Sequence, residues 1–497
     1  MTLQDGLRDV VRGDAGGSST VPPPLGPRGT VASRARRWWP VAVGVVAVLA
    51  VTQATLSTRD RSHLSRIQAM PGVARTTDAS VTEKWRRDVP GSIELVRSST
   101  TVDGRWVGPA VTKDGIQTVE AIDPDTGTTT WSTVLAGPEP AATGVTIPAP
   151  TCGLARPTGT ATGSPTLLCL VLAGYSTPGG GASSASPEAG NARIVVVDPS
   201  TGTVTAERPA TPSSVLAVDG DVAYVASVAS DGHGVLTATD PSTGEVRWTF
   251  TTPEALQVTA GQPARVRLSA RDGHVLVGAE QGAAWLLSSS GSAERAFAAV
   301  AGAALIAPRA GVLAVQTWSG ASSPLLRVLT GNGGSTAGRA IRGDVLTPTV
   351  DDGSAPGLVF TGGAQLTAWD AATGEQRWSV PMPSTTGNLV LLDSRLYQST
   401  PIGLRALDAT SGALLWQKRV LIPTGSSRLP SVVSDGRAVF LLETAFTQRL
   451  VAFDPTDGSR MWASLLPADT TDLTVVGGRI VALQRSYFHG DAVSALG

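Results

Sequence analysis

The chain has 497 residues, is rich in Gly and Pro, and carries a formal net charge of −1. This length allows two or three ordinary domains or one large all-β ring, so it does not fix the number of domains. A charge balance so close to zero removes the electrostatic argument for a nucleic-acid partner, and we expect none. Abundant turn-forming residues, without long amphipathic helical stretches, favour many short strands.

The clearest localisation signal lies near the N-terminus. Residues 38–56, WWPVAVGVVAVLAVTQATL, carry no charge and approach the roughly 20 residues that cross a bilayer as a helix. Arg34, Arg36 and Arg37 precede this stretch, so the positive-inside rule predicts that residues 1–37 are cytoplasmic. We therefore expect a single-pass protein of the cell membrane whose remaining chain is extracytoplasmic.

Two features around this span bear on whether it is retained. The small residues of the segment 52–54 suit cleavage of a signal peptide, which is the alternative to an anchor. The long segment before the span, and Pro40 within it, favour the anchor. Residues 1–37 cannot bury a core and are predicted to be a disordered tail, and residues 57–81 read as a polar tether that holds the exported domain off the membrane.

After the tether, one cassette recurs along the chain. It reads Ala, any residue, Asp, three positions that include Thr or Ser, Gly, three further positions and Trp. Five copies keep the Trp, and a sixth, at residues 196–206, has lost it. Weaker copies surround Gly291 and Gly334. The marker residues of the six copies are Asp123, Gly127 and Trp131; Asp198 and Gly202; Asp240, Gly244 and Trp248; Asp370, Gly374 and Trp378; Asp408, Gly412 and Trp416; and Asp454, Gly458 and Trp462.

Each cassette position has a physical role. The Asp side chain can accept hydrogen bonds from the amides of the turn that it opens, and Gly supplies the positive φ that a tight turn requires. The Trp offers a flat face to the next unit and an N–H to a backbone acceptor. A turn and a short apolar strand, such as DGDVAYVAS from Asp219, recur upstream of the cassettes. Each unit is thus a small meander that cannot bury its own faces, which predicts a propeller blade.

The two ends of the repeat region predict how the ring closes. The chain stops within residues 491–497, where another cassette would begin, whereas Trp85 stands alone in TEKWRRDV, residues 82–89. We predict that this N-terminal strand completes the last blade. The fold class is then all-β, a propeller of four-stranded blades over residues 82–497 preceded by a single transmembrane helix. The units number eight or nine, according to how the copies at Gly291 and Gly334 are scored, and we expect eight.

The cassettes resemble the tryptophan-docking motif of the pyrroloquinoline quinone (PQQ)-like β-propeller repeats, over about residues 82–497. Such repeats occur in quinoprotein alcohol dehydrogenases and in the lipoprotein of the outer-membrane β-barrel assembly machine, so the resemblance implies a redox enzyme or a binding scaffold. In the enzymes, the quinone lies between a Trp and a disulfide of adjacent cysteines, with calcium bound by a Glu, an Asn and an Asp. Cys152 and Cys169 are seventeen positions apart, so that disulfide cannot form and no quinone site is carried over.

The two cysteines have a simpler interpretation. Outside the cytoplasm, Cys152 and Cys169 are expected to form a disulfide that pins an insertion of about residues 148–191, and two free buried thiols are the alternative. The insertion is the most individual feature of the repeat region. It is a candidate interaction surface, and a tolerated loop expansion explains it equally well.

Residues for catalysis or metal binding are not apparent. Asp123 and Asp125 in DPDTG could suggest calcium, but turn capping accounts for them. The histidines are scattered without metal-ligand spacing, at His63, His233, His274 and His489. We find no nucleophile elbow, phosphate loop or paired-carboxylate pattern, and we predict no catalytic, cofactor or metal residues.

The sequence thus favours a non-catalytic, membrane-anchored propeller that binds an unidentified protein or ligand of the cell envelope. A PQQ-dependent oxidoreductase, with PQQ and calcium as cofactors, is the first alternative. A sensor of an envelope ligand or glycan is the second.

Overall fold

The computed structural model of the chain describes a set of internal ranges, and the account below concerns these residues. The ranges are 61–138, 147–157, 164–175, 189–256, 264–319, 323–329, 340–382, 388–422, 429–444, 446–486 and 490–497. The predicted tail, the predicted span at residues 38–56, Gly334 and His489 lie outside them. No helix within these ranges is long and apolar enough to cross a membrane. The chain divides into two units after His63, and residues 64–497 form one of them.

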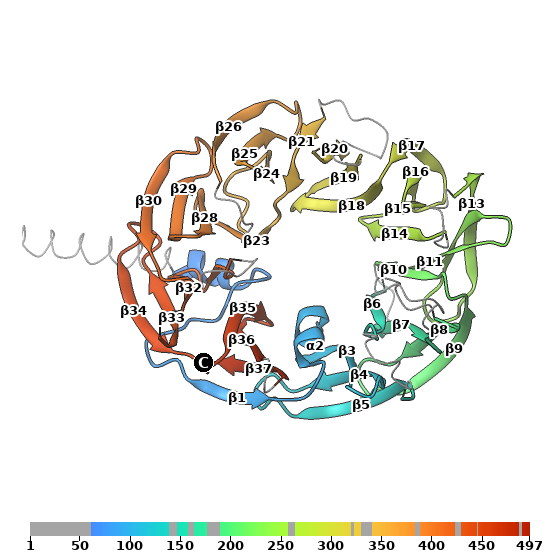
Figure 1. The fold of residues 1–497 in the computed structure, drawn as a ribbon, viewed down its shortest axis with the longest axis horizontal. Coiled ribbons are helices and arrows are strands. Elements are labelled where there is room, and N and C mark those ends of the chain that lie inside the picture. The colour runs from blue at the N-terminus through green and yellow to red at the C-terminus, as the bar shows by residue number, and fades with distance from the viewer. Residues whose placement is uncertain are drawn as a thin grey trace, which may run out of the picture. The chain divides into compact units, whose positions relative to one another are not determined.

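Residues 64–497 form a closed ring of β-sheets, in which every sheet is one blade (Figure 1). The prediction of an all-β propeller with four-stranded blades is confirmed. The predicted count of eight is wrong, because the described residues build nine sheets. The parts of the chain that contain the two weak copies each build a four-stranded blade, although the copies lack the Asp and the Trp of the cassette.

The first five blades follow one another along the chain. Their strands are, in blade 1, β2 (Thr100–Val102), β3 (Arg105–Val111), β4 (Gln117–Ile122) and β5 (Thr129–Ala136); in blade 2, β6 (Thr151–Ala155), β7 (Thr166–Ala173), β8 (Asn191–Val197) and β9 (Val204–Ala210); in blade 3, β10 (Val215–Asp219), β11 (Val222–Val228), β12 (His233–Thr239) and β13 (Val246–Ala255); in blade 4, β14 (Val266–Arg271), β15 (His274–Ala279), β16 (Gly282–Ser288) and β17 (Ala293–Val300); and in blade 5, β18 (Gly302–Arg309), β19 (Val312–Trp318), β20 (Leu325–Leu329) and β21 (Ile341–Arg342).

The last four blades include one strand from the start of the ring and one extra strand, β23. Their strands are, in blade 6, β22 (Asp344–Val345), β24 (Leu358–Gly362), β25 (Gln365–Asp370) and β26 (Gln376–Pro381); in blade 7, β23 (Pro348–Asp351), β27 (Leu389–Leu392), β28 (Arg395–Thr400), β29 (Gly403–Asp408) and β30 (Leu414–Arg419); in blade 8, β31 (Val433–Ser434), β32 (Val439–Thr444), β33 (Gln448–Phe453) and β34 (Arg460–Leu465); and in blade 9, β35 (Thr470–Val476), β36 (Arg479–Ser486), β37 (Gly490–Leu496) and β1 (Glu83–Arg87).

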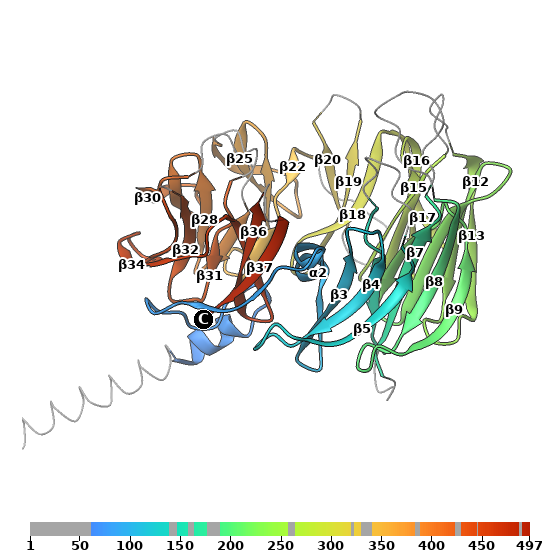
Figure 2. The same cartoon turned by 60° about the horizontal axis from the view of Figure 1, so that its bottom comes forward.

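The two ends of the blades define two faces of the ring (Figure 2). In a regular meander such as that of blade 3, the turn from the first to the second strand and the cassette turn from the third to the fourth lie at one end, which we call the turn face. The other connections lie at the opposite end, which we call the loop face. Within the predicted insertion, β7 ends at Ala173 and β8 begins at Asn191, and these two strand ends lie at the loop face.

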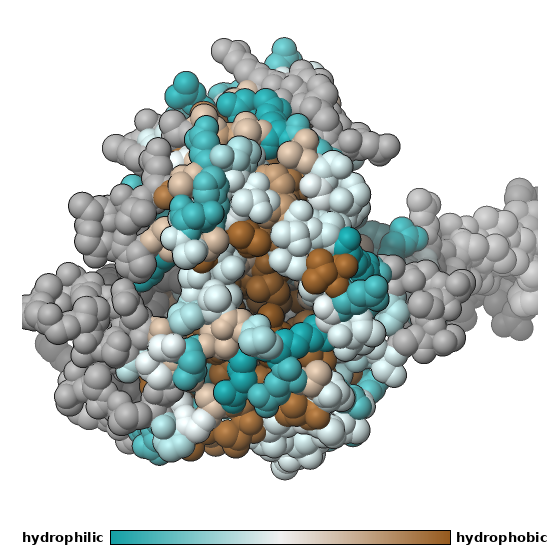
Figure 3. Space-filling model, turned by 90° about the vertical axis from the view of Figure 1, so that its right-hand side faces the viewer, coloured by the Kyte–Doolittle hydropathy of each residue, from teal (hydrophilic) through white to brown (hydrophobic). Residues whose placement is uncertain are grey.

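Burial along the strands follows their position in the blade. The second strand β7 reads TLLCLVLA and is buried at most positions, because neighbouring blades cover both of its faces. The outer strand β5 reads TTWSTVLA; its first six residues are exposed or partly buried, and only its last two are buried. On the side of the ring that Figure 3 faces, hydrophobic residues show in small groups between paler and hydrophilic ones. The core of the propeller is therefore a series of layers between blades.

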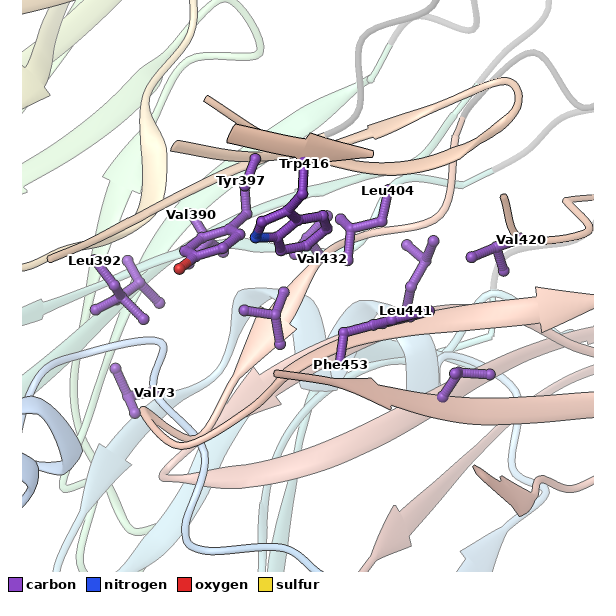
Figure 4. Close-up of a cluster of buried hydrophobic side chains, with 14 of the residues drawn as sticks. Val73, Val390, Leu392, Tyr397, Leu404, Trp416, Val420, Val432, Leu441 and Phe453 are labelled. Atoms are coloured by element: carbon purple, nitrogen blue, oxygen red, sulfur yellow. The ribbon is translucent and has the colours of Figure 1, made fainter. Parts of the chain in front are cut away.

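The layer between blades 7 and 8 shows this packing in detail (Figure 4). The Trp416 and Tyr397 rings lie 5.9 Å apart between centroids and at 45°. Leu441 and Phe453 of blade 8 pack in the same buried cluster. Val73, from the segment before β1, also contributes to this cluster, so residues upstream of the first blade take part in the core.

The ring closes between the two ends of the repeat region. β1 pairs antiparallel with β37, with Trp85 opposite Ala495, which is the pairing expected from the sequence. Thr82 and Gly497 exchange two backbone hydrogen bonds, of 3.3 and 3.1 Å, beyond the end of this ladder. Blade 9 therefore takes three strands from the C-terminal part of the chain and its outer strand from residues 83–87.

Residues 64–78, which we call the strap, lie on the turn face of blades 8 and 9. Val73 forms a parallel bridge with Ser434, and the Arg75 N–H donates to Gly478 O at 2.7 Å. A Cβ on Gly72 would lie 2.4 Å from a backbone oxygen of β23, so this close approach requires glycine. The C-terminal part of the segment predicted as a tether is thus packed on the propeller.

Candidate functional site in the channel

The cassette tryptophans couple each blade to the next. A Cβ on Gly458, whose φ is 69°, would lie 2.5 Å from the Trp416 ring, so only glycine fits under the indole. The Trp416 N–H donates to Pro455 O at 3.2 Å. The same contact joins further pairs, Trp85 on Gly127, Trp131 on Gly202, Trp248 on Gly291 and Trp378 on Gly412. These residues hold blades together and do not converge on a reactive centre.

Blade 2 has lost its Trp, and an arginine replaces it. A Cβ on Gly244 would lie 2.7 Å from Arg208 Nε, and Arg208 donates from Nη2 to Pro241 O at 2.8 Å and to Ser242 O at 2.9 Å. The planar guanidinium therefore covers the glycine turn of blade 3 much as an indole does elsewhere. This role was not predicted from the sequence. The signal that was available is Arg208 itself, a long planar cation two positions after Ala206, which holds the place of the lost Trp.

The junction between blades 8 and 9 has no complete cassette turn to receive Trp462. Instead, Asp78 accepts the Ser80 N–H at 2.8 Å and opens a turn just before β1, and Val81 is buried in the cluster that contacts Trp462. Ser464 Oγ donates to Val81 O at 2.8 Å. The chain segment before the first blade thus supplies a substitute turn at the closure point.

The cassette aspartates cap the turns that they open. All six accept a backbone N–H two residues downstream, namely Asp123, Asp198, Asp240, Asp370, Asp408 and Asp454. A hydrogen bond from Arg377 and further bonds from the turn lower the pKa of Asp370 to about 2. Hydrogen bonds from turn residues also lower the pKa values of Asp198, Asp240 and Asp408.

These caps predict a specific acid sensitivity. Because the folded pKa of Asp370 lies below its unfolded value near 4, its contribution to stability is present above about pH 4 and is lost as the pH falls toward about 2. As the pH falls from about 4 to about 2, the free energy of unfolding of Asp370→Asn should decrease less than that of the wild-type chain. Urea unfolding at each pH measures this difference. Equal losses in the two proteins would contradict the capping role.

The two cysteines lie within one hairpin. Cys152 on β6 faces Cys169 on β7 in the strand register, and the two form a disulfide. Cys169 is fully buried in the layer between blades 1 and 2. This cross-strand bond fastens the inner hairpin of blade 2, which carries the predicted insertion.

Carboxylates and histidines are dispersed over the ring. Asp125 forms an ion pair with Arg479, which joins blade 1 to blade 9. His233 Nδ1 lies 2.7 Å from Thr252 O, and His274 Nε2 lies 3.6 Å from Glu294. Within the described ranges, no group of three or more His, Cys, Asp or Glu is arranged to hold a metal ion.

Three elements of the chain lie on the inner side of the ring. The helix α2 (Ser92–Ser98) lies against β3 and β37, and its Leu95 is fully buried. A Cβ on Gly108 of β3 would lie 2.6 Å from Leu95 O, so glycine permits this approach. β23 adds a parallel strand to the inner edge of blade 7, and the strap crosses beside it (Figure 1). A ring of nine blades leaves a wide channel, which these segments narrow.

Two cavities remain along the inner edge of β35. One has a volume of about 430 Å³ and the other about 540 Å³, and they share Gly72, Arg97, Thr474 and Val475. They are therefore neighbouring parts of one polar site, bounded by the strap, α2 and β35. None of the described residues that line them is aromatic.

Arg97 is the charged group common to both cavities. Its Nη2 lies 3.9 Å from Asp472 Oδ2, beyond hydrogen-bond range, and about a third of its side chain is exposed. Asp472 is held in place because its Oδ1 accepts the N–H groups of Ser431 and Leu473 at 3.0 and 2.9 Å. The site therefore places a cationic and an anionic side chain next to each other, with the amide of Asn388 and the hydroxyl of Thr349 also in its lining.

Comparison with known proteins shows what the repeats are similar to. Residues 326–487 match the family described as outer membrane protein assembly factor BamB. No curated protein matches the chain. Solved structures that resemble it include BamB from Moraxella catarrhalis (16% identity, 84% of this chain and 99% of that chain, TM-score 0.42) and quinohemoprotein alcohol dehydrogenase from Comamonas testosteroni (12% identity, 88% and 83%, TM-score 0.40). The family match, the cassettes and their docking on glycine turns show that the chain is built of PQQ-like β-propeller repeats.

Proposed function

We propose that this protein is a non-catalytic scaffold, anchored in the cell membrane, whose extracytoplasmic propeller binds another component of the cell envelope. The observation that carries the proposal is the narrowed channel. α2, β23 and the strap lie on the inner side of the ring, and buried residues such as Leu95 and Val350 fix them there.

The membrane anchor and the extracytoplasmic location are parts of this proposal. They rest on the uncharged stretch at residues 38–56 and on the arginines that precede it. The disulfide between Cys152 and Cys169 supports an oxidising compartment, because such bonds persist mainly outside the cytoplasm.

A PQQ-dependent oxidoreductase is the alternative that the repeat type raises, and two features of the described residues speak against it. Stacking of a flat tricyclic ring needs an aromatic floor, and the described lining of the two cavities has none. The disulfide joins neighbouring strands inside blade 2, and its cysteines are seventeen positions apart in the chain. A ligand or glycan sensor stays a second alternative, for which the polar site around Arg97 is the natural location.

The scaffold function is tested by photo-crosslinking in intact cells. Lysine-reactive reagents suit this chain poorly, because it contains only Lys84, Lys113 and Lys418. A photo-reactive amino acid placed singly at exposed positions around the ring, such as Asp114, Val134 and Phe446, should give reproducible adducts with an envelope component at one or more sites. The absence of a reproducible adduct from every position tested would refute the proposal.

A further inference from the structure

The large exposed apolar side chains gather on two neighbouring blades. Of the eleven in the described residues, the four outside blades 7 and 8 are all valines. The seven on blades 7 and 8, which we call the apolar rim, are Ile402, Leu414, Leu415, Leu421, Phe446, Met461 and Leu465. Exposed apolar side chains scattered singly are ordinary, but a group of this size on adjacent blades marks a surface for interaction.

Backbone contacts show that part of the rim is continuous across the two blades. Ile402 O accepts the Val420 N–H at 3.1 Å, and Leu421 O accepts the Thr444 N–H at 2.8 Å. Phe446, whose side chain is fully exposed, follows in the loop after Thr444. These residues therefore lie together at the loop face, where blades 7 and 8 adjoin.

The charges beside the rim are mainly positive. Arg419 and Arg449 are exposed, and within the described ranges neither forms an ion pair. Arg449 lies opposite Leu465 in the register of β33 and β34. The carboxylate nearby, Glu443, also lies opposite Arg449 but is engaged by Arg460 at 3.3 Å. A complementary partner therefore carries carboxylates next to its apolar side chains.

The position of the rim favours a protein over a lipid surface as the occupant. β30 and β34 are the outermost strands of their blades, and their free edges offer backbone groups that another protein strand can pair with and lipid tails cannot. The strap reaches the ring on the turn face, at the turn of Ser434 and at Gly478, whereas Ile402 and Phe446 lie on the loop face. The chain thus enters the propeller on the face opposite to this part of the rim.

We propose that the apolar rim of blades 7 and 8 binds an extended segment of an envelope protein in which apolar side chains alternate with, or are flanked by, Asp and Glu. The apolar side chains of the segment cover Leu421, Phe446 and their neighbours, and its carboxylates meet Arg419 and Arg449. This inference rests on the proposed scaffold function and assigns its surface and the chemistry of its partner.

The test places p-benzoylphenylalanine at Phe446 of the full-length chain in intact cells, with Val246 of blade 3, which is 57% exposed, as the matched control position. We expect a protein adduct from position 446 and none of that adduct from position 246. The cross-linked peptide, identified by mass spectrometry, should contain apolar residues next to Asp or Glu.

Charge reversal gives the second readout. The double variant Arg419→Glu and Arg449→Glu should lower the yield of the adduct about tenfold, whereas Arg419→Lys with Arg449→Lys should keep most of it. The proposal is overturned by a yield that charge reversal leaves unchanged, by an adduct only with lipid, with a second copy or within the chain itself, or by no adduct. Capture of a partner from other positions but not from position 446 would contradict the assignment of the apolar rim as the binding surface. It would not contradict the scaffold function.

Discussion

Replacing Trp416 by alanine is expected to destabilise the propeller by about 3–5 kcal/mol, in the range of buried aromatic deletions. Trp416 is 7% exposed and covers Gly458, whose positive φ excludes a compensating side chain. It also packs beside Tyr397, and both residues donate to Pro455 O. Its loss therefore opens a cavity between blades 7 and 8 and leaves a carbonyl with one donor fewer.

Urea unfolding followed by circular dichroism measures this loss. Trp416→Phe, which keeps an aromatic face and loses the N–H, should cost less than the alanine variant. Gln417→Ala is the matched control, because Gln417 is exposed on the same strand and its substitution should change stability by less than about 0.5 kcal/mol. A loss below about 1 kcal/mol in Trp416→Ala would show that docking on Gly458 does not couple the blades.

Replacing Arg309 by alanine is expected to cost a similar amount, about 3–5 kcal/mol, through a buried charge rather than a cavity. The Arg309 side chain is 5% exposed and pairs with both carboxylate oxygens of Asp351, with Nε 2.7 Å from Oδ2. It also donates to Ala355 O and lies 6.0 Å over the Phe360 ring. Arg309 is the last residue of β18 in blade 5, and Asp351 is the last residue of β23, the extra strand of blade 7. This pair therefore holds β23 to blade 5.

The pH dependence of the same variant identifies the cause. Burial raises the pKa of Asp351, but hydrogen bonds from Arg309 and from the Gly353 N–H outweigh this and lower it below its usual value. Without Arg309 the pKa of Asp351 should rise, so the variant recovers part of its deficit as the pH falls and the carboxyl is protonated. The double variant Arg309→Ala with Asp351→Ala should lose less than the sum of the single variants, and strict additivity would contradict the pairing.

The sequence predicted the parts of this fold that repeat. The cassette of Asp408, Gly412 and Trp416 predicted a turn, a positive φ and a docking indole, and these features depend on local chemistry that one copy reveals. Trp85 predicted closure because a Trp strand without its cassette needs a partner. The count failed because blades 4 and 5 keep the strand pattern while their cassettes have diverged, and because β21 has only two residues.

The channel and the rim could not be predicted in this way. α2 is seven residues long, and its burial against β3 depends on Gly108, which no periodicity relates to Leu95. The strap lies within a polar segment that suggests a free tether, and only the tertiary structure brings Val73 to Ser434. Exposure of Phe446 or Leu421 is likewise a property of neighbouring blades, since the sequence alone does not distinguish a buried leucine from an exposed one.

The central claim is that a PQQ-like propeller here serves as a scaffold whose channel is narrowed by segments of its own chain. Its most direct test is a thermal melt of the purified full-length protein with PQQ and calcium, with calcium alone as the control, because a ligand that binds the native state must raise the melting temperature by mass action. We predict that PQQ with calcium raises the melting temperature no more than calcium alone does. A saturable rise with PQQ would contradict the claim and direct attention to an enzymatic site in the channel.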